Sequence, residues 1–389
     1  MRAQVVIVGG GPAGLMLAQV LDAHGIGSVV LERKTKAYVL GRIRAGVLEQ
    51  GTVQMLRDYG VGARMDREGT PHDGVLIEWQ GQPAVMIDGP KYAGVGMMTY
   101  GQTQITEDLY AAREAAGQAL VFEAEDVALH GLTGAAPWVT YRKDGQQQRI
   151  DCDFIVGCDG FHGVSRPSIP EGVRREYEKV YPFGWLGVLA AVPPLTEVIY
   201  SRHDRGFALA SQRSPMLSRY YVQVPLSDRV EDWPDDRFWT ELKARFPAHW
   251  ADRIVTGPAL EKSIAPLRSF VCEPLQYGRL FLAGDAGHIV PPTGAKGLNL
   301  AFSDVHYLSR GLLAHYRDGD DSPLAAYSDT ALKRIWGAIR LSWWLTTLLH
   351  VFPDDQPFDR KIRANDYLHL ANSEAALANL AQQFVGLPY

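Results

Sequence analysis

The stretch that decides the fold covers residues 4–34 and reads QVVIVGGGPAGLMLAQVLDAHGIGSVVLERK. Its order is an apolar run, a glycine-rich turn, a helix-like segment, a glycine stop and a second apolar run that ends at Glu32. This order predicts a strand, a helix and a second strand, with the spacing GxGxxG at Gly9, Gly11 and Gly14. These glycines would permit a tight turn, a close approach of a pyrophosphate to the backbone, and close packing of the helix on the strand.

Glu32 strengthens this signal because it closes the second predicted strand about twenty residues after the glycine turn, where a carboxylate accepts hydrogen bonds from ribose hydroxyls. A GxGxxG spacing alone is weak, but here the flanking strands and the acid stand where a dinucleotide site requires them. We therefore predict a dinucleotide site, against the alternative of an ordinary glycine-rich turn. Both NAD(P) and FAD bind to such a unit, so this segment leaves the dinucleotide open.

Two further segments end in the same way. Residues 149–166, RIDCDFIVGCDGFHGVSR, contain an apolar run that stops at Asp159, and residues 279–300, RLFLAGDAGHIVPPTGAKGLNL, contain one that stops at Gly284 and Asp285. Three strands that end in glycine and an acid suit one extended ligand lying across the carboxyl ends of a single sheet. FAD has that length, and the chain contains no second GxGxxG for a nicotinamide dinucleotide.

The composition narrows the class of protein. A chain of 389 residues usually forms two or more domains. With 46% hydrophobic residues, 21% charged residues and a net charge of −5, neither disorder nor a nucleic-acid-binding surface is expected, so the partner should be a small molecule. Cys152, Cys158 and Cys272 lack the spacing of metal ligands and fit reduced thiols in a cytoplasmic protein, and we predict no metal site.

We expect no secretory signal at the start of the sequence. The first residues lead directly into a strand-like run, without the charged and apolar regions of a secretory signal. Residues 341–352, LSWWLTTLLHVF, are apolar but far shorter than the roughly 18 residues that indicate a membrane span. They fit a protein core or a subunit interface, and we expect no membrane partner.

Together, GxGxxG with Glu32, the CDG segment and residues 284–304 resemble the single-component flavoprotein aromatic hydroxylases. Five segments are similar to the members of that family that hydroxylate para-hydroxybenzoate, namely LGRIRAGVLEQG, YPFGWLG, GFALASQRS, SRYYVQVP and EKSIAPLRSF. The similarity extends over almost the whole chain. It implies a mixed α/β fold with a Rossmann-like FAD-binding domain, an antiparallel-sheet substrate domain and a helical C-terminal region.

The resemblance also suggests how the chain divides. The expected FAD-binding segments are residues 1–71, 98–178 and 266–321, the substrate-binding segments are residues 72–97 and 179–265, and the C-terminal region is residues 322–389. Within the substrate-binding segments, the alternating runs RGFALASQ and SRYYVQVP indicate antiparallel strands.

The C-terminal region has apolar residues at helical spacing, in a run that Pro353 ends. Such a stripe must be covered. It belongs either to an internal core helix or to the interface of a homodimer, which the family implies. The stripe is Leu332, Ile335, Trp336, Ile339 and Trp343.

The resemblance implies the FAD contacts as well. Gly284 and Asp285 would meet the ribityl chain and the pyrophosphate, and the following helix would point its N-terminus at the flavin ring. Reduced flavin carries negative charge near its pyrimidine edge, which the partial positive charge of a helix start stabilises. From the residues alone, Arg44 could instead form a surface salt bridge. The further implied contacts are Arg42, Arg44, Gln102, Asp159, Lys296, Gly297, Leu298 and Asn299. Asn299 is also implied to be a catalytic residue.

For the substrate, Ser211, Arg213 and Tyr221 match the carboxylate clamp of the family. A guanidinium presents a planar fork of donors that fits a carboxylate, and hydroxyl groups can complete the site. From the residues alone, Arg213 could equally be solvated.

The resemblance implies an enzyme, an NAD(P)H-dependent monooxygenase that converts 4-hydroxybenzoate to 3,4-dihydroxybenzoate. NADPH would reduce the flavin, molecular oxygen would add to give a C4a-hydroperoxide, and the ring carbon ortho to the phenol would take its distal oxygen. Tyr200 matches the residue that hydrogen-bonds the phenol oxygen, and Pro292 and Thr293 would lie along the reacting edge. Water must be excluded, because an exposed hydroperoxide loses hydrogen peroxide.

Two positions depart from the family. The usual proton path runs from the phenol through one tyrosine to a second and then towards a histidine, but Phe384 occupies the second position, between Tyr200 and His72. Val198 stands where the family more often has leucine. Both changes remove atoms near the bound ring, so 3,4-dihydroxybenzoate could bind again and be converted to gallate. The alternative is neutral drift at an apolar wall.

The nicotinamide donor is suggested by a basic cluster just after Glu32, which suits the 2′-phosphate of NADPH. Charged residues after a strand are often only a solvated surface, so NADH stays open as the donor. The cluster is Arg33, Lys34, Lys36 and Tyr38. Three further residues resemble the family's remaining NADPH contacts, namely His162, Arg166 and Arg268.

Two other functions stay open from the sequence. One is an FAD-dependent oxidase or dehydrogenase of an aromatic acid, which would put no oxygen into its substrate. The other is a non-catalytic flavin-binding module.

Overall fold

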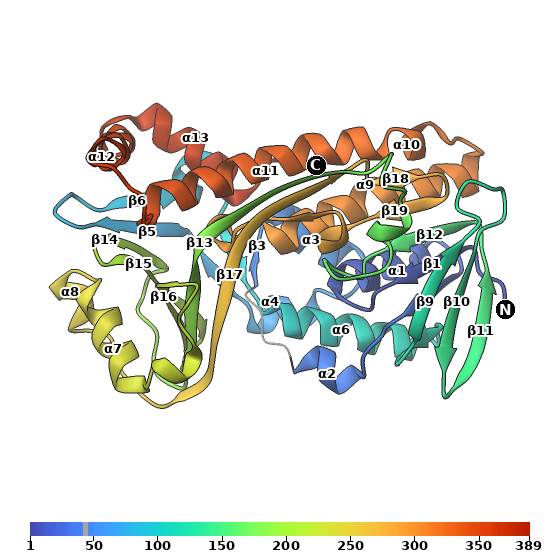
Figure 1. Cartoon of the computed structure of the whole chain (residues 1–389), viewed down its shortest axis with the longest axis horizontal. Helices are drawn as coiled ribbons and strands as arrows, with labels where there is room; N and C mark the ends of the chain where they lie inside the picture. The colour runs from blue at the N-terminus through green and yellow to red at the C-terminus, as the bar shows by residue number, and fades with distance from the viewer. Residues whose placement is uncertain (42–45) are drawn as a thin grey trace.

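The computed structural model describes residues 1–41 and 46–389. Figure 1 shows two main sheets at opposite ends of the molecule, with two long strands running between them and a long helix lying across both. This is a mixed α/β fold, as predicted. Arg42 and Arg44, two of the predicted FAD contacts, lie outside the described residues.

The first sheet has six strands in the order β18-β19-β12-β1-β2-β8, and every neighbouring pair except β18 with β19 is parallel. The three strands predicted to end in glycine and an acid, β12, β1 and β19, are neighbours, so the prediction of one shared sheet is confirmed. The strands are β1 (Val5–Val8), β2 (Ser28–Leu31), β8 (Leu120–Val121), β12 (Phe154–Gly157), β18 (Gln276–Tyr277) and β19 (Leu280–Leu282).

Helices cover this parallel sheet, which explains why its strands are continuous apolar runs. The four side chains of β1 are buried, and α1, which follows it, packs against two other helices, α6 and α9. Pro12 stands in the first turn of α1, where a missing N–H costs nothing. The helices are α1 (Pro12–Ala23), α6 (Gln102–Ala115) and α9 (Gly297–Asp318).

The second sheet has eight strands in the order β20-β17-β13-β16-β15-β14-β5-β6. The predicted antiparallel pair is confirmed, since β15 and β16 pair with Leu209 opposite Tyr221. The strands are β5 (Gly74–Trp79), β6 (Val85–Asp88), β13 (Arg175–Ala190), β14 (Ile199–His203), β15 (Gly206–Ser214), β16 (Leu217–Pro225), β17 (Ala259–Glu273) and β20 (His288–Ile289).

β13 and β17 form a long antiparallel ribbon that runs from the second sheet towards the first (Figure 1). Because β17 also pairs with β20, the ribbon ends close to the third glycine-acid corner, the 3-10 turn η3 (Gly284–Ala286). The division of the chain into the predicted domains stays a prediction.

The C-terminal region is helical, as expected. The predicted stripe lies on α11, but its two tryptophans, Trp336 and Trp343, are 38% and 42% exposed, whereas Ile335 and Ile339 are buried. The helix ends at Leu349 rather than near Pro353, because His350 already has an extended backbone. The helices here are α10 (Ser322–Ala325), α11 (Tyr327–Leu349), α12 (Pro357–Asn372) and α13 (Glu374–Val385).

Smaller elements complete the molecule. The small sheets are β11-β10-β9, with β9 (Glu125–His130), β10 (Trp138–Lys143) and β11 (Gln146–Asp151), and β3-β7-β4, with β3 (Val47–Leu48), β4 (Thr70–His72) and β7 (Met97–Thr99). The short helices are α2 (Lys36–Leu40), α3 (Gln50–Asp58), α4 (Ala63–Glu68), α5 (Gly89–Ala93), α7 (Asp235–Ala244) and α8 (Ala248–Ala251). Among the described residues, no helix has the length and apolar character needed to cross a membrane.

Candidate active site

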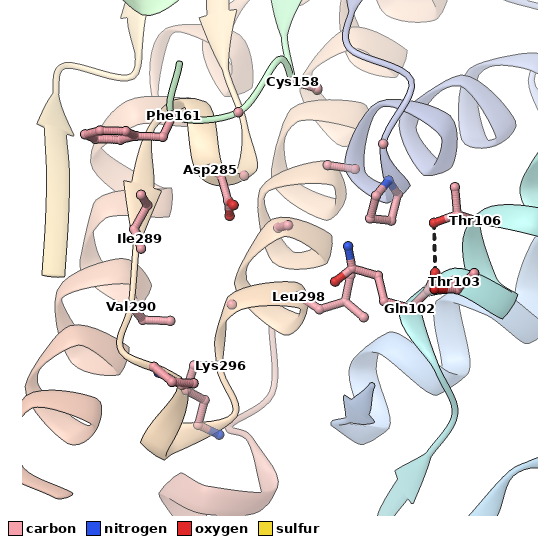
Figure 2. Close-up of a pocket in the computed structure, with 18 of the residues that line it drawn as sticks. Gln102, Thr103, Thr106, Cys158, Phe161, Asp285, Ile289, Val290, Lys296 and Leu298 are labelled. Atoms are coloured by element: carbon pink, nitrogen blue, oxygen red, sulfur yellow. Dashed lines mark hydrogen bonds between the residues drawn. The ribbon is translucent and has the colours of Figure 1, made fainter. Parts of the chain in front are cut away.

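A cavity of about 650 Å³ lies at the carboxyl ends of the parallel strands and reaches the face of the eight-stranded sheet. This volume is within the range of small-molecule sites. Figure 2 shows Gln102 and Asp285 projecting into the cavity from opposite sides, with Phe161, Ile289 and Val290 along one wall. The cavity therefore joins the predicted dinucleotide corners to the predicted substrate residues.

Glycine is required at the three motif positions for different local reasons. A Cβ on Gly9, whose φ is +113°, would stand 2.2 Å from the carbonyl oxygen of Cys158. A Cβ on Gly14 would stand 2.1 Å from the carbonyl oxygen of Gly9, so this glycine allows close packing of helix and strand. A Cβ on Gly11 would meet nothing within 4 Å, because it would enter the cavity at the start of α1. The free space at Gly11 and the free N–H groups of this helix start suit a pyrophosphate.

Glu32 lines the cavity while it also fixes the glycine turn. Its carboxylate accepts hydrogen bonds from the N–H groups of Gly10, at 2.9 Å, and Lys34, at 2.7 Å. A carboxylate has about four acceptor positions, so Glu32 retains the capacity to bind ribose hydroxyls.

Asp159 forms the second corner. One of its oxygens accepts hydrogen bonds from the backbone N–H and the hydroxyl of Ser165, at 2.9 and 3.0 Å. The other oxygen is buried and has no partner among the described residues. Burial raises the pKa of Asp159, and the hydrogen bonds from Ser165 oppose this. A ribityl or ribose hydroxyl that donated to the free oxygen would satisfy it.

The third corner is held by Asp304, which is buried in α9. One Asp304 oxygen accepts the N–H of Gly284 at 2.8 Å and contacts Nε2 of His288 at 2.6 Å. Gly284 has a φ of +63°, which favours glycine. With Asp285 lining the cavity, all three corners fit an extended, hydroxyl-bearing ligand such as FAD.

Lys296, Gly297 and Leu298 line the cavity at the start of α9, as the predicted contact of this helix start with a flavin requires. The ammonium of Lys296 pairs with the buried carboxylate of Glu49 at 2.6 Å and donates to the carbonyl oxygen of Phe384 at 2.7 Å. Burial lowers the pKa of Lys296, and Glu49 opposes this.

Asn299 does not line the cavity. Its side chain accepts from the N–H of Glu49 and from Thr52, and it donates to the carbonyl oxygens of Val47 and Ala295, at 2.8 to 2.9 Å. With all four bonds made inside the protein, Asn299 holds the start of α9 against β3.

The substrate-binding sheet contributes the other end of the cavity. Tyr200, Leu209 and Tyr221 are paired across β14, β15 and β16, so they share one face of the sheet. Ser211 and Arg213 follow on that face at intervals of two, and all of these side chains line the cavity. Val198 and Pro292 line it as well.

The electrostatics of this end fit an anionic aromatic ligand. Arg213 keeps part of its surface accessible, as expected of a cavity wall, while burial lowers its pKa. The neighbouring Tyr221 opposes this lowering of the Arg213 pKa. Burial also raises the pKa of Tyr200, so its phenol is a neutral hydrogen-bonding group at neutral pH. Ser211 donates its hydroxyl to the carbonyl oxygen of Arg219 at 3.1 Å and would have to rotate to meet a carboxylate.

Besides Asn299, three predicted catalytic residues lie outside the cavity wall. Thr293 is buried and bonds the hydroxyl of Thr346 at 2.9 Å. The Nδ1 atom of His72 lies 3.1 Å from the carbonyl oxygen of Gly74, while its Nε2 is buried with no partner among the described residues, and burial lowers its pKa. Phe384 is buried in the same apolar cluster as Tyr200.

The predicted NADPH residues fall into three groups. Arg33, Lys34, Tyr38 and His162 line the cavity, whereas Lys36 pairs with Glu114 at the surface at 2.8 Å. The guanidinium groups of Arg166 and Arg268 lie 4.5 and 4.6 Å from the centre of the Phe161 ring, which itself lines the cavity.

Several cavity residues were not predicted from the sequence. Trp185 and Phe161 lie in segments that resemble the family, and their aromatic character beside glycines was the available signal. His350 lies behind the cavity wall. It is the one ionisable residue in the apolar run 341–352, and this could have indicated a specific role for it. The other unpredicted wall residues include Val47, Thr103, Cys158 and Leu209.

Known proteins resemble the chain over its whole length. The family described as FAD binding domain matches residues 2–342. A p-hydroxybenzoate hydroxylase of Acinetobacter baylyi is 50% identical over 390 residues, which cover 100% of this chain and 96% of that protein.

Solved structures agree in fold. p-Nitrophenol 4-monooxygenase PnpA from Pseudomonas putida DLL-E4 has a TM-score of 0.83 at 16% identity, with 100% of both chains covered. The OxyS anhydrotetracycline hydroxylase from Streptomyces rimosus has a TM-score of 0.78 at 24% identity, covering 99% of this chain and 76% of that one. The full-length identity and the domain match establish the family, and the chain belongs to the FAD-dependent aromatic hydroxylases of the p-hydroxybenzoate hydroxylase type.

Proposed function

We propose that the protein converts 4-hydroxybenzoate to 3,4-dihydroxybenzoate, with bound FAD, molecular oxygen and NADPH. The observation that carries the proposal is the wall that joins Arg213 to Tyr200 in the cavity that also holds the three glycine-acid corners. A guanidinium and a phenol on one wall suit an aromatic acid with a phenol at its other end. The substrate named for the 50% identical relative supports the same choice.

Bound FAD would supply the redox chemistry that activates oxygen, and the residues of this chain would orient the substrate. Arg213, with Tyr221 and Ser211, would bind the carboxylate, and its burial strengthens a charge-assisted hydrogen bond. Tyr200 would bind the phenol oxygen, which favours ionisation of the phenol and makes the neighbouring ring carbon nucleophilic. Apolar wall residues such as Leu209 and Val47 would exclude water.

The FAD-loaded protein tests this directly. NADPH oxidation should rise at least about tenfold on adding 4-hydroxybenzoate, and chromatography should identify 3,4-dihydroxybenzoate. Labelled molecular oxygen should appear in the product, which separates hydroxylation from oxidase or dehydrogenase chemistry. Oxidation that no hydroxybenzoate stimulates would instead favour a flavin-binding module.

We also propose that the product is hydroxylated again, to gallate. Phe384 places an apolar ring in the cluster that contains Tyr200, and Val198 lines the cavity. Nε2 of His72 is buried without a partner among the described residues, so a water bound to it could serve the proton path in place of the tyrosine hydroxyl. The purified enzyme should convert 3,4-dihydroxybenzoate to gallate, and Phe384→Tyr should reduce this second step relative to the first. Peroxide without gallate would reject the proposal.

The donor and the assembly are further parts of the proposal. NADPH is favoured because Arg33 and Lys34 line the cavity near its Glu32 end, where a 2′-phosphate would meet positive charge. We propose a homodimer through the exposed Trp336 and Trp343 and action in the cytoplasm, where the three free cysteines would stay reduced. Initial rates with NADPH and NADH test the donor, and light scattering tests the dimer.

A further inference from the structure

Trp185 forms part of the cavity wall, and its indole is held from behind by His350. The indole N–H donates to Nε2 of His350 at 2.8 Å, and both side chains are buried. Trp185 belongs to β13, in the middle of the substrate-binding sheet, whereas His350 directly follows the last residue of α11. One hydrogen bond thus ties the cavity wall to the C-terminal helical region.

The chemistry of this bond fixes the state of the histidine. An indole N–H can only donate, so Nε2 of His350 must carry no proton. The ring proton is then on Nδ1, which donates to the carbonyl oxygen of Thr346 at 2.9 Å. The ring also stacks on Phe183, with centroids 4.7 Å apart and planes 3° apart. Both nitrogens and one face of the ring are therefore fixed.

His350 supports both ends of the proposed substrate site through one aromatic ring each. Trp185 lies 5.2 Å from the ring of Tyr221, beside the carboxylate clamp. Phe207 stacks on His350 at 4.5 Å and meets Tyr200 edge-on at 5.5 Å. Rotation of the Trp185 indole would therefore disturb Tyr221 directly, and it would also reach the phenol side through Phe207, on which Trp185 stacks at 5.0 Å.

We propose that His350 is a positioning residue that fixes the Trp185 indole, and that this indole limits which ring substituents an aromatic acid can carry. The inference rests on the proposed function, since it takes the acid to lie between Arg213 and Tyr200. Without its acceptor, the indole N–H would be buried and unsatisfied, which favours a turn of the ring. A turned indole would widen the cavity for acids with an additional methyl group on the ring.

Two substitutions form a matched pair. His350→Phe keeps a ring in the stack but offers no acceptor, whereas His350→Gln offers an amide oxygen to Trp185 and an amide N–H to Thr346. In the FAD-loaded enzyme, His350→Phe should weaken 4-hydroxybenzoate binding about tenfold, because an unsatisfied buried donor is costly. It should also reduce the preference for 4-hydroxybenzoate over 3-methyl-4-hydroxybenzoate about tenfold. His350→Gln should remain within about twofold of the wild type in both measurements.

Trp185→Phe provides the control for the pair, because it removes the indole N–H. In the Trp185→Phe background, His350→Phe should change the preference for 4-hydroxybenzoate over 3-methyl-4-hydroxybenzoate by less than about twofold. This is expected when two residues act through one hydrogen bond. An effect of His350→Phe as large in this background as in the wild type would overturn the coupling. If His350→Phe does not fold, His350→Leu takes its place in the same cycle.

A second readout needs no aromatic acid. The indole N–H resonance of Trp185, identified by its loss in Trp185→Phe, should shift in His350→Phe and return towards the wild-type position in His350→Gln. An unshifted resonance in His350→Phe would reject the positioning role. If the wild-type enzyme binds no hydroxybenzoate, the proposed function fails, and the resonance still decides whether His350 holds Trp185.

Discussion

Acid should destabilise the folded protein through His350, and the structure gives the size of the effect. Burial lowers the pKa of His350 from the usual 6.5 to about 3. The unfolded chain therefore takes up this proton at a higher pH than the folded protein does. The stability contributed by the neutral ring is complete above the unfolded value of 6.5 and is lost as the pH falls from 6.5 towards 3.

The magnitude follows from linkage. Each pH unit below the unfolded pKa costs about 1.4 kcal/mol for one proton, so between about pH 7 and about pH 5.5 the loss from His350 is about 1.3 kcal/mol. That is a measurable part of a typical folding free energy of about 5–15 kcal/mol. Urea unfolding of the FAD-loaded protein at both pH values, with the same excess of FAD, would measure it.

His350→Gln is the control, because it keeps both hydrogen bonds and cannot titrate. The other buried histidines titrate equally in both proteins, so the difference between their two pH losses isolates His350. The wild type should lose about 1.3 kcal/mol more than His350→Gln over this interval. Equal losses in the two proteins would refute the assignment of a buried, neutral His350.

The remaining predictions concern the cavity. Gly14→Ala should destabilise the protein by roughly 1–3 kcal/mol in thermal unfolding, because its Cβ would stand 2.1 Å from a backbone oxygen. Gly11→Ala, whose Cβ meets nothing within 4 Å, should leave the stability of the FAD-free protein within about 0.5 kcal/mol but weaken FAD binding, measured by flavin fluorescence. Arg213→Gln should raise the Kd of 4-hydroxybenzoate roughly a hundredfold without changing FAD affinity, because loss of one partner of a buried charged pair costs about 2–5 kcal/mol. Asp304→Ala should lower the Tm and weaken FAD binding together, because it removes the acceptor at 2.8 Å from the N–H of Gly284; a lower Tm with unchanged FAD affinity would show that this corner is not needed for FAD.

The fold and the three corners could be predicted because their causes are local in the sequence. An apolar run predicts a buried strand, and a glycine next to an acid at its end predicts the turn that follows, as at Gly284 and Asp285. Arg213, the charged residue of the carboxylate clamp, was identified by resemblance. Alternation along a strand shows which side chains share a face of the sheet, but not which ligand they bind.

What could not be predicted depends on contacts between distant segments. Trp185 and His350 are 165 residues apart, and no local pattern records that their side chains meet. The same applies to Asn299, because three of its four partners lie in residues 47–52, about 250 residues earlier in the chain, and keep it out of the cavity. A predicted contact residue can thus be fully occupied inside the protein, and only the assembled structure shows this.

The pairing of Ala190 with Ala259 brings together the two ends of residues 191–258. Those residues contain Tyr200 and Arg213, yet they enter and leave the molecule at neighbouring points of one ribbon. A chimera that exchanged this segment with a relative would transplant the acid-recognising side chains as one insert, with two adjacent junctions. Trp185 lies outside this segment and would come from the recipient protein. The donor segment must therefore carry aromatic side chains that can pack against Trp185.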